Sequence, residues 1–528
     1  MKNQILMVWF FVALVFLQVN LFGQRHKGKF PAVFNLEDIS GTNGYVIKGM
    51  SYIGDTKGQG DINDDGINDV LVSTLPLKKT FLIFGNKEKR PASIDILNLN
   101  NGSLTGVTID GYSEFVSILG DINGDGISDV LIYRGDCYVM FGGKEWPEKM
   151  IYPLNGFSIE GFNAVYARSA TGIGDINKDG FQDIFIADGG IVNNVRYRGY
   201  VLFGRKRWPK KINVMNLDGS DGFIIKGIKE NEGYTSISEA GDINGDGIPD
   251  VIVGIPFAYN ATGQSFVVFG KEGMWPSEID LENLDGNNGF AINGINLGDQ
   301  SGYSVSTAGD INDDGIDDIV IGAPYANKES MFYGKGQSYV LFGRNNPWPR
   351  IFQLSDLDGT NGFIINGVGK NENVGIAVSG IGDFNADNVT DIIISANNDQ
   401  QFEGQCYIVF GDKEWSSEVN LSSLNGTNGF KINKTGGSRI GRLVNGIGDI
   451  NGDGVDDVFI GEYGFIAEQL NYVLFGCCGE VPPPLPPDDH SLALGLGISG
   501  GVVGLVALGV SGYYGYQWYY RSSYEAVQ

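Results

Sequence analysis

A nine-residue pattern of oxygen-bearing side chains occurs seven times in this chain of 528 residues. Asp, Asn, Asp and Asp occupy positions 1, 3, 5 and 9, and Gly occupies position 6 in every copy but one. The main-chain carbonyl of position 7 can add a fifth oxygen, and hard oxygen donors without nitrogen or sulfur favour calcium, with magnesium second. The candidate ligands are Asp61, Asn63, Asp65, Ile67, Asp69; Asp121, Asn123, Asp125, Ile127, Asp129; Asp175, Asn177, Asp179, Phe181, Asp183; Asp242, Asn244, Asp246, Ile248, Asp250; Asp310, Asn312, Asp314, Ile316, Asp318; Asp383, Asn385, Asp387, Val389, Asp391; and Asp449, Asn451, Asp453, Val455, Asp457.

Two interpretations of this pattern compete. Asp, Asn and Gly are also the ordinary residues of hairpin turns, but turn chemistry does not require the constant Asp at position 9. The sixth copy has Asn388 at the Gly position. Asn tolerates a left-handed backbone, so binding can survive there, although a glycan on the sequon Asn388-Val389-Thr390 would interfere. We therefore predict up to seven calcium ions with a structural role, one for each loop.

Charge and composition argue against other classes of function. The formal net charge is −26, whereas a nucleic-acid-binding protein needs a basic face. Only two His residues occur, His26 and His490, and both lie outside the repeats, so neither histidine acid–base catalysis nor His-ligated zinc is expected. The sequence shows no nucleophile–base set and predicts no enzyme. A Ser or Asp constellation assembled from several repeats stays open.

The loops recur at the spacing of a large structural repeat. They begin at residues 61, 121, 175, 242, 310, 383 and 449, so the intervals are 60, 54, 67, 68, 73 and 66 residues. Each repeat contains four short strand patterns, which in the fifth copy cover residues 302–309, 319–321, 338–342 and 363–365. Four strands in seven repeats predict an all-β fold, a seven-bladed β-propeller with four-stranded blades. A β-solenoid or a row of separate sandwiches is the alternative.

The last repeat lacks its connector and fourth strand. The segment from Phe30 to Ile47 matches the segment from Trp275 to Ile292, which holds these elements in the fourth repeat. The N-terminal strand is therefore expected to complete the last blade and to close the ring, which removes two exposed sheet edges.

The fifth repeat carries the motif of a known family. Gly302-Tyr303-Ser304-Val305, the loop 310–318 and Gly322-Ala323-Pro324 closely resemble the FG-GAP repeat of integrin α chains, and the similarity extends over about residues 30–476. The resemblance implies calcium loops on the lower face of a propeller and ligand contacts on the opposite face.

The chain also departs from that family. The long β-sandwich legs and the juxtamembrane Gly-Phe-Phe-Lys-Arg motif of integrin α chains are missing, so an integrin β partner is not implied. The layout looks more like small single-pass FG-GAP membrane proteins, such as the T-cell immunomodulatory protein family. The phospholipase D family that carries these repeats needs a His-rich zinc domain, which this sequence lacks.

The two ends of the chain predict export and a membrane anchor. Residues 1–23 are typical of a signal peptide, with a retained signal anchor as the alternative. Residues 24–478 form the predicted propeller, 479–491 a Pro-rich spacer, 492–516 a transmembrane helix and 517–528 a short cytoplasmic tail. This is a single-pass type I protein of the cell membrane with an extracellular propeller; a removed GPI signal is the alternative. Small-xxx-small pairs in the helix would permit a homodimer or a membrane partner subunit: Gly497, Gly500, Gly501 and Gly504.

The loops opposite the metal loops are the predicted ligand site. The longest lie in the third and fifth repeats and offer Arg and aromatic anchors of the kind found in binding hot spots. These candidates are Arg196, Tyr197, Arg198, Met331, Phe332 and Tyr333. We expect a calcium-binding adhesion or recognition protein that binds a protein or glycan ligand on the cell surface or matrix. The alternative is a membrane-tethered scaffold whose propeller docks another subunit in the same membrane.

Two further sets of residues follow from this interpretation. Export makes the Asn-x-Ser/Thr sequons candidate glycosylation sites. Beside Asn388 they are Asn101, Asn260, Asn420, Asn425 and Asn433. Trp recurs after the third strand of five repeats and is expected to pack between blades: Trp146, Trp208, Trp275, Trp348 and Trp415.

Overall fold

The computed structural model describes residues 30–50, 55–57, 59–74, 77–100, 104–111, 115–133, 137–150, 155–161, 167–192, 195–227, 236–330, 333–398, 403–434, 439–463 and 469–477. The chain divides into two compact units, Met1–Val481 and Pro482–Gln528. All described residues belong to the first unit.

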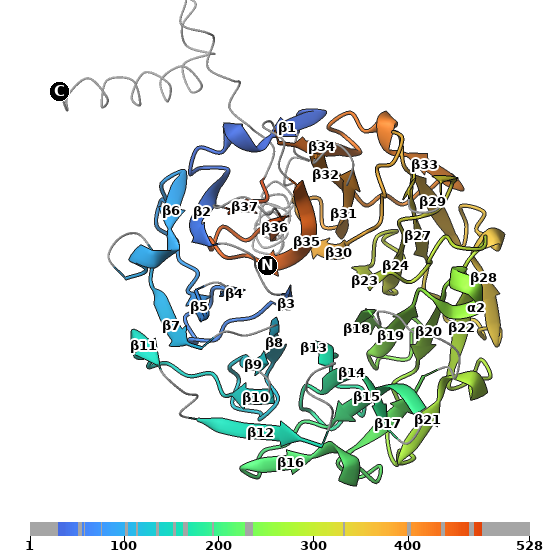
Figure 1. Cartoon of the computed structure of the whole chain (residues 1–528), viewed down its shortest axis with the longest axis horizontal. Helices are drawn as coiled ribbons and strands as arrows, with labels where there is room; N and C mark the ends of the chain where they lie inside the picture. Colours follow the sequence, from blue (N-terminus) through green and yellow to red (C-terminus); the bar gives the residue numbers. More distant parts are fainter. Residues whose placement is uncertain are drawn as a thin grey trace, which may run out of the picture. The chain divides into compact units, whose positions relative to one another are not determined.

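Seven β-sheets stand around a common axis like the blades of a propeller (Figure 1). The first blade contains β4 (Val70–Thr74), β5 (Lys79–Ile83) and β7 (Gly106–Asp110). The short strand β3 (Asp55–Lys57), which leads into the first loop, pairs in parallel with β8 of the second blade. The seven-bladed all-β architecture predicted from the sequence is confirmed.

Blades two to seven each contain four antiparallel strands, ordered from the inner side of the ring outward. The second holds β8 (Phe115–Gly120), β9 (Asp129–Tyr133), β10 (Cys137–Met140) and β12 (Gly156–Glu160), and the third holds β13 (Ala167–Gly172), β14 (Ile184–Val192), β15 (Val195–Leu202) and β17 (Gly222–Lys226). The fourth holds β18 (Ser236–Gly241), β19 (Asp250–Ile255), β20 (Gln264–Val268) and β22 (Gly289–Asn293), and the fifth holds β23 (Ser304–Gly309), β24 (Asp318–Ala323), β27 (Gln337–Leu341) and β29 (Gly362–Asn366). The sixth holds β30 (Val378–Gly382), β31 (Asp391–Asn398), β32 (Glu403–Val409) and β34 (Gly429–Asn433), and the seventh holds β35 (Arg439–Gly448), β36 (Asp457–Tyr463), β37 (Gln469–Leu474) and β2 (Gly44–Met50).

A short fifth strand on the outer edge joins each blade to the next. It comes from the connector of the following blade and pairs in parallel with the fourth strand, as β28 (Ile351–Gln353) does with β22. The other outer strands are β1 (Val33–Asn35), β6 (Ser93–Asp95), β11 (Lys149–Met150), β16 (Lys211–Asn213), β21 (Glu278–Asp280) and β33 (Glu418–Asn420). The prediction of four-stranded blades missed this strand, because two or three residues that pair across a blade boundary leave no alternating pattern in the sequence.

Short 3-10 helices follow most of the outer strands, and each begins with a buried aliphatic side chain. They are η1 (Leu36–Asp38), η2 (Ile96–Asn98), η4 (Val214–Asn216), η5 (Leu281–Asn283), η6 (Leu354–Asp356) and η7 (Leu421–Ser423). The loop between β19 and β20 contains the turn α2 (Ala258–Ala261), and the loop between β24 and β27 contains the small hairpin of β25 (Lys328–Ser330) and β26 (Tyr333–Gly334).

The N-terminal segment lies in the last two blades. β2 is the fourth strand of the seventh sheet and pairs antiparallel with β37, beginning at Gly44 opposite Leu474. β1 pairs in parallel with β34 of the sixth blade. The first and last repeats are therefore held together by backbone pairing, which covers sheet edges that an open array would expose.

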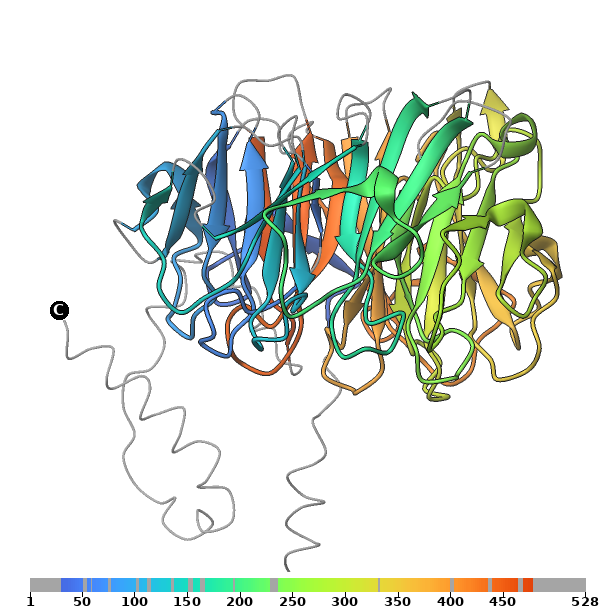
Figure 2. The ribbon, with the colours of Figure 1, turned by 90° about the horizontal axis from the view of Figure 1, so that it is seen from below.

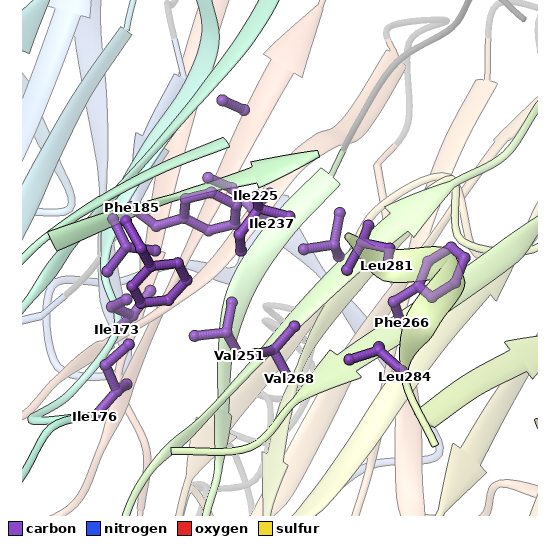
Figure 3. Packing of buried hydrophobic residues seen from close by; sticks show 14 of the residues in the cluster. Ile173, Ile176, Phe185, Ile225, Ile237, Val251, Phe266, Val268, Leu281 and Leu284 are labelled. Atoms are coloured by element: carbon purple, nitrogen blue, oxygen red, sulfur yellow. The ribbon is translucent and has the colours of Figure 1, made fainter. Parts of the chain in front are cut away.

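Buried side chains fill the spaces between adjacent blades. Figure 3 shows one such cluster, in which Ile173, Phe185 and Ile225 of the third blade face residues of the fourth. The predicted packing role of the connector Trp residues is confirmed: Trp348 stacks on Phe290 of the preceding blade, with ring centroids 4.1 Å apart. Three further Trp–Phe pairs repeat this stack: Trp208–Phe157, Trp275–Phe223 and Trp415–Phe363.

Among the described residues, no helix has both the length and the apolar character needed to cross a membrane. The predicted signal peptide, Pro-rich spacer, transmembrane helix and tail lie outside the described residues, as do the four Gly residues of the helix.

The Trp–Phe stacks lead to a first prediction. Trp348→Ala removes a buried ring from the boundary between the fourth and fifth blades, and is expected to lower the free energy of unfolding by about 3–5 kcal/mol. Denaturant unfolding measures the loss. Met274→Ala is the control, since Met274 is 94% exposed, and a change of at most about 0.5 kcal/mol is expected there. Equal stability of the two variants would contradict a packing role for Trp348.

Candidate metal loops

The seven Asp-rich loops all occupy the same place in their blades. Each joins the first strand to the second, as residues 242–250 join β18 to β19, so all seven lie on one face of the ring. The loops between the second and third strands lie on the opposite face. Figure 2 shows the two sets of loops at opposite edges of the ring. We call the face with the Asp-rich loops the lower face and the other the upper face.

The carboxylate at position 1 organises its own loop. Oδ1 of Asp310 accepts a hydrogen bond from the N–H of Asp314 (2.9 Å), and Oδ2 accepts one from the N–H of Gly315 (2.8 Å). Oδ1 of Asp314 at position 5 in turn accepts the N–H of Ile316 (3.0 Å). The same three bonds occur in the other six loops. The backbone of each loop thereby fixes the positions of these two carboxylates.

Position 6 requires a left-handed backbone. Gly315 has φ of +88°, and nothing within 4 Å would meet a Cβ there, so conformation rather than space selects Gly. Asn388 in the sixth loop adopts φ of +65°, in line with the tolerance of Asn for this region. Its N–H donates to Oδ2 of Asp383 (2.9 Å), as the Gly N–H does in the other loops.

The Asp at position 9 is buried in all seven loops. Asp318 is 0% exposed. Its Oδ2 accepts the N–H of Ile311 (3.0 Å) at position 2, and its Oδ1 accepts the N–H of Gly343 (2.8 Å), which follows the third strand. All seven copies repeat this pair of bonds. The fold therefore needs Asp at position 9 whether or not a metal is bound. These hydrogen bonds are a second explanation for the constant Asp, which the sequence analysis attributed to metal binding alone.

Burial makes these carboxylates reluctant to ionise. Desolvation raises the pKa of Asp69 to about 7 and that of Asp129 to about 8, against the lowering effect of their two N–H donors. The carboxylates at positions 5 and 1 of the same loop raise both pKa values further. In the other five loops burial raises the pKa of the position-9 Asp well above its ordinary value. Because the pKa of this carboxyl group is higher in the folded state than in the unfolded state, the free energy of unfolding falls as pH rises from about 4 to about 7. A cation beside the ionised carboxylate offsets that loss.

Adjacent loops are connected through the backbone. The carbonyl of Ile243, at position 2 of the fourth loop, accepts the N–H of Arg344 in the fifth blade (2.9 Å). The equivalent bond occurs at every blade boundary, including that between the last blade and the first, where Asn86 N–H donates to the Ile450 carbonyl (3.1 Å). The lower face is therefore a continuous ring of hydrogen bonds.

The donor chemistry of the loops fits a hard cation. Asn385, at position 3 of the sixth loop, is 0% exposed, and its Oδ1 has no hydrogen-bond partner within the described part of the chain. An unpaired buried amide oxygen is costly, and a bound cation would satisfy it. Within the same residues, no group of three or more His, Cys, Asp or Glu side chains is placed to hold a metal ion.

The predicted ligand-site residues are described only in part. Arg198 is half-buried in β15, beside Asp188 and in hydrogen-bond contact with Tyr200. Met331 and Phe332, and the side chains of Arg196, Tyr197 and Tyr333, lie outside the described residues.

Sequence reasoning missed Tyr259 and Leu297 on the upper face, which are 60% and 71% exposed. Tyr259 precedes the sequon that begins at Asn260, and only its aromatic character could have marked it as a contact residue.

The position-9 carboxylate leads to a second prediction. With a chelator present, Asp318→Asn should lower the free energy of unfolding by about 1–3 kcal/mol. Asn has one acceptor oxygen, and its amide nitrogen would leave the N–H of either Ile311 or Gly343 unpaired. Asp314→Asn is the matched control, since exposed Asp314 keeps its Oδ1 as an acceptor and should change little. Equal losses in denaturant unfolding would show that position 9 has no role beyond that of position 5.

Comparison with known proteins shows which families have sequences similar to this chain. Residues 235–268 and 301–341 match the family model described as the FG-GAP repeat. The integrin α chain pat-2 of Caenorhabditis elegans is 27% identical over 259 residues, which cover 48% of this chain and 19% of that protein. Integrin α-PS5 of Drosophila melanogaster is 32% identical over 157 residues, 29% of this chain and 14% of that protein. A phosphatidylinositol-glycan-specific phospholipase D of Dictyostelium discoideum is 24% identical over 366 residues, 67% of this chain and 33% of the enzyme.

The chain spans no more than about a third of the length of these relatives. Among solved structures, the WD40 domain of a Toxoplasma gondii coronin covers 86% of this chain with 8% identity and a TM-score of 0.38. The fold therefore rests on the strand pairing of this chain itself. The fourth and fifth blades therefore carry FG-GAP repeats, and the chain is similar over nearly half of its length to integrin α chains.

Proposed function

We propose that this protein is a calcium-stabilised recognition propeller of the cell surface, with calcium in the loops of the lower face and a protein or glycan ligand on the upper face. The observation that carries the proposal is the sevenfold repetition of one acidic loop geometry on a single face. Extracellular placement and a single-pass anchor are part of the proposal, supported by the two apolar ends of the sequence and by the relation to integrin α chains.

Calcium binding is supported by the chemistry of each loop. The side chains of positions 1, 3, 5 and 9 and the carbonyl of position 7 would hold the ion. The raised pKa of the buried Asp at position 9 and the unpaired amide oxygen of Asn385 are two costs that a divalent cation would remove. The chemistry that calcium supplies here is charge compensation, which holds the hairpin between the first two strands in place.

Recognition by the upper face is supported by a strained turn. Tyr259, Asn260 and Ala261 have φ of +50°, +56° and +60°, three consecutive left-handed residues without a Gly. Such residues cost about 1–3 kcal/mol each and persist where surrounding structure holds them. Here Gln300 N–H donates to the Ala261 carbonyl (2.9 Å), and Ser301 N–H donates to that of Thr262 (3.0 Å). The turn thereby presents exposed Tyr259, a residue type common in binding hot spots.

The calcium proposal predicts a stabilisation that a chelator reverses. At a free calcium concentration ten times the dissociation constant, each occupied site should add about 1.4 kcal/mol to the free energy of unfolding. A melting curve of the purified chain should shift upward with calcium and return with chelator. Asp310→Asn should reduce the calcium-dependent part, while Asp358→Asn, an exposed Asp outside the loops, should leave it intact. An unchanged midpoint in the original chain would reject the proposal.

The recognition proposal predicts a contact at Tyr259. In cross-linking of intact cells, Tyr259→Ala should reduce capture of matrix or opposing-cell molecules by about tenfold or more, the effect of losing a hot-spot residue. Met274→Ala is the control, since Met274 is exposed in a connector near the lower face. Capture of only a subunit in the same membrane, unaffected by Tyr259→Ala, would instead support the scaffold alternative.

A further inference from the structure

Two sequons lie next to each other on the outer rim of the sixth blade. Asn420 ends β33 and precedes η7, and Asn425 opens the turn that leads into β34. Both side chains are exposed, as are the hydroxyl residues Ser422 and Thr427 that complete the sequons.

The two turns hold each sequon in the same local geometry. Oδ1 of Asn425 accepts hydrogen bonds from the N–H of Thr427 (2.9 Å) and from its hydroxyl (2.6 Å). Oδ1 of Asn420 accepts the N–H of Ser422 (3.1 Å) and its hydroxyl (2.7 Å). Each hydroxyl therefore lies beside the amide of its own Asn, where one transferase site can engage both groups. Because the oxygen makes the turn, Nδ2 donates no hydrogen bond within the described residues, and a substituent on it leaves the turn unchanged.

Two other sequons have a different geometry. The hydroxyl of Thr262 donates to the Tyr259 carbonyl (2.9 Å), away from Asn260. The hydroxyl of Thr390 donates to the Ala308 carbonyl in the fifth blade (2.8 Å), while the backbone N–H of Asn388 is held by Asp383.

The last two sequons are less fully described. Asn433 is half-buried in β34, between β1 and β32. Its partner Thr435, together with Asn101 itself, lies outside the described residues.

We propose that Asn420 and Asn425 are the N-glycosylation sites of the described propeller surface, and that Asn260 and Asn388 stay unmodified. This proposal rests on the proposed export of the chain. In the reaction, a bond forms between Nδ2 and the anomeric carbon of an oligosaccharide carried on a polyprenyl diphosphate. The bond between that carbon and the diphosphate oxygen breaks, the diphosphate leaves with the bonding electrons, and Nδ2 gives up one proton.

The location gives these glycans a consequence for binding. The carbonyl of Gly426, next to Asn425, accepts the N–H of Phe30 (3.2 Å), where the N-terminal segment joins the sixth blade. Glycans on Asn425 and Asn420 would therefore cover the outer side of the ring closure. A partner protein would be kept from this rim, and the upper face would remain accessible.

The test is site-by-site removal of sequons in the full chain, expressed in cells with a eukaryotic secretory pathway. Asn420→Gln and Asn425→Gln should each remove one endoglycosidase-sensitive step of gel mobility, and the double variant should remove both. Ser422→Ala and Thr427→Ala, which keep the Asn side chains, should give the same losses. Asn260→Gln is the matched control and should leave the mobility unchanged.

Two results would overturn the site assignment. One is loss of a mobility step in Asn260→Gln, or a glycan on Asn388 in peptide mass spectra of the unaltered chain. The other is unmodified Asn420 and Asn425 in peptide mass spectra of a chain that microsomes protect from protease. A chain that microsomes do not protect would contradict export instead, and the same variants behind the leader of a secreted host protein would still decide which sequons are used.

Discussion

The rest of the propeller depends on the two hydrogen bonds that the buried carboxylate at position 9 accepts in each blade. It stands at the start of the second strand of each blade and joins two other segments, the beginning of its own loop and the turn after the third strand, through one oxygen each. At Asp457 the donors are Ile450 (3.0 Å) and Gly476 (2.9 Å). A hydrogen bond contributes about 0.5–1.5 kcal/mol net, and leaving a buried donor unpaired costs about 1–3 kcal/mol. No other polar side chain type recurs at every blade with this burial in the described residues.

This carboxylate also decides which residue can follow the third strand. A Cβ on Gly343 would lie 2.3 Å from the carbonyl oxygen of Asp317, and a Cβ on Gly476 would lie 2.2 Å from that of Asp456, so the close approach that makes the hydrogen bond excludes a side chain. The chain then continues directly to a residue that donates to the preceding loop, as Cys477 N–H donates to the Phe384 carbonyl (3.1 Å). The hydrogen bond that fixes the Gly within its own blade thus also places the next residue against the preceding blade. Each loop is therefore positioned by its neighbour around the ring.

Features that depend on short-range patterns of residue types could be predicted from the sequence, and features that depend on contacts between distant residues could not. The seven repeats, the strand order within a blade and the loop geometry around Asn388 depend on residue types at fixed spacing, so they could be predicted. The outer strands, such as Ile351–Gln353, depend on three residues meeting the edge of another blade, and no short-range pattern records that contact. The role of Asp at position 9 was assigned to metal alone, since the N–H of Gly343 is 25 residues away from Asp318 in the chain. The exposed turn at Tyr259 depends on positive φ angles that its residue types do not predict.

Non-Gly residues with positive φ occur on both faces of the molecule but in different settings. Non-Gly residues with positive φ in the lower loops, such as Asp313 (+56°) and Asn388 (+65°), belong to a hydrogen-bonded motif that occurs seven times, so the loop itself accounts for them. The upper face holds Tyr259, Asn260 and Ala261, where three such residues follow one another once only in the described chain. Repetition explains strain that a fold needs for its own stability, and this turn has no counterpart in the other described blades. The backbone bonds from Gln300 and Ser301 hold this turn in place and leave the Tyr259 side chain exposed, and the proposed recognition role rests on that exposure.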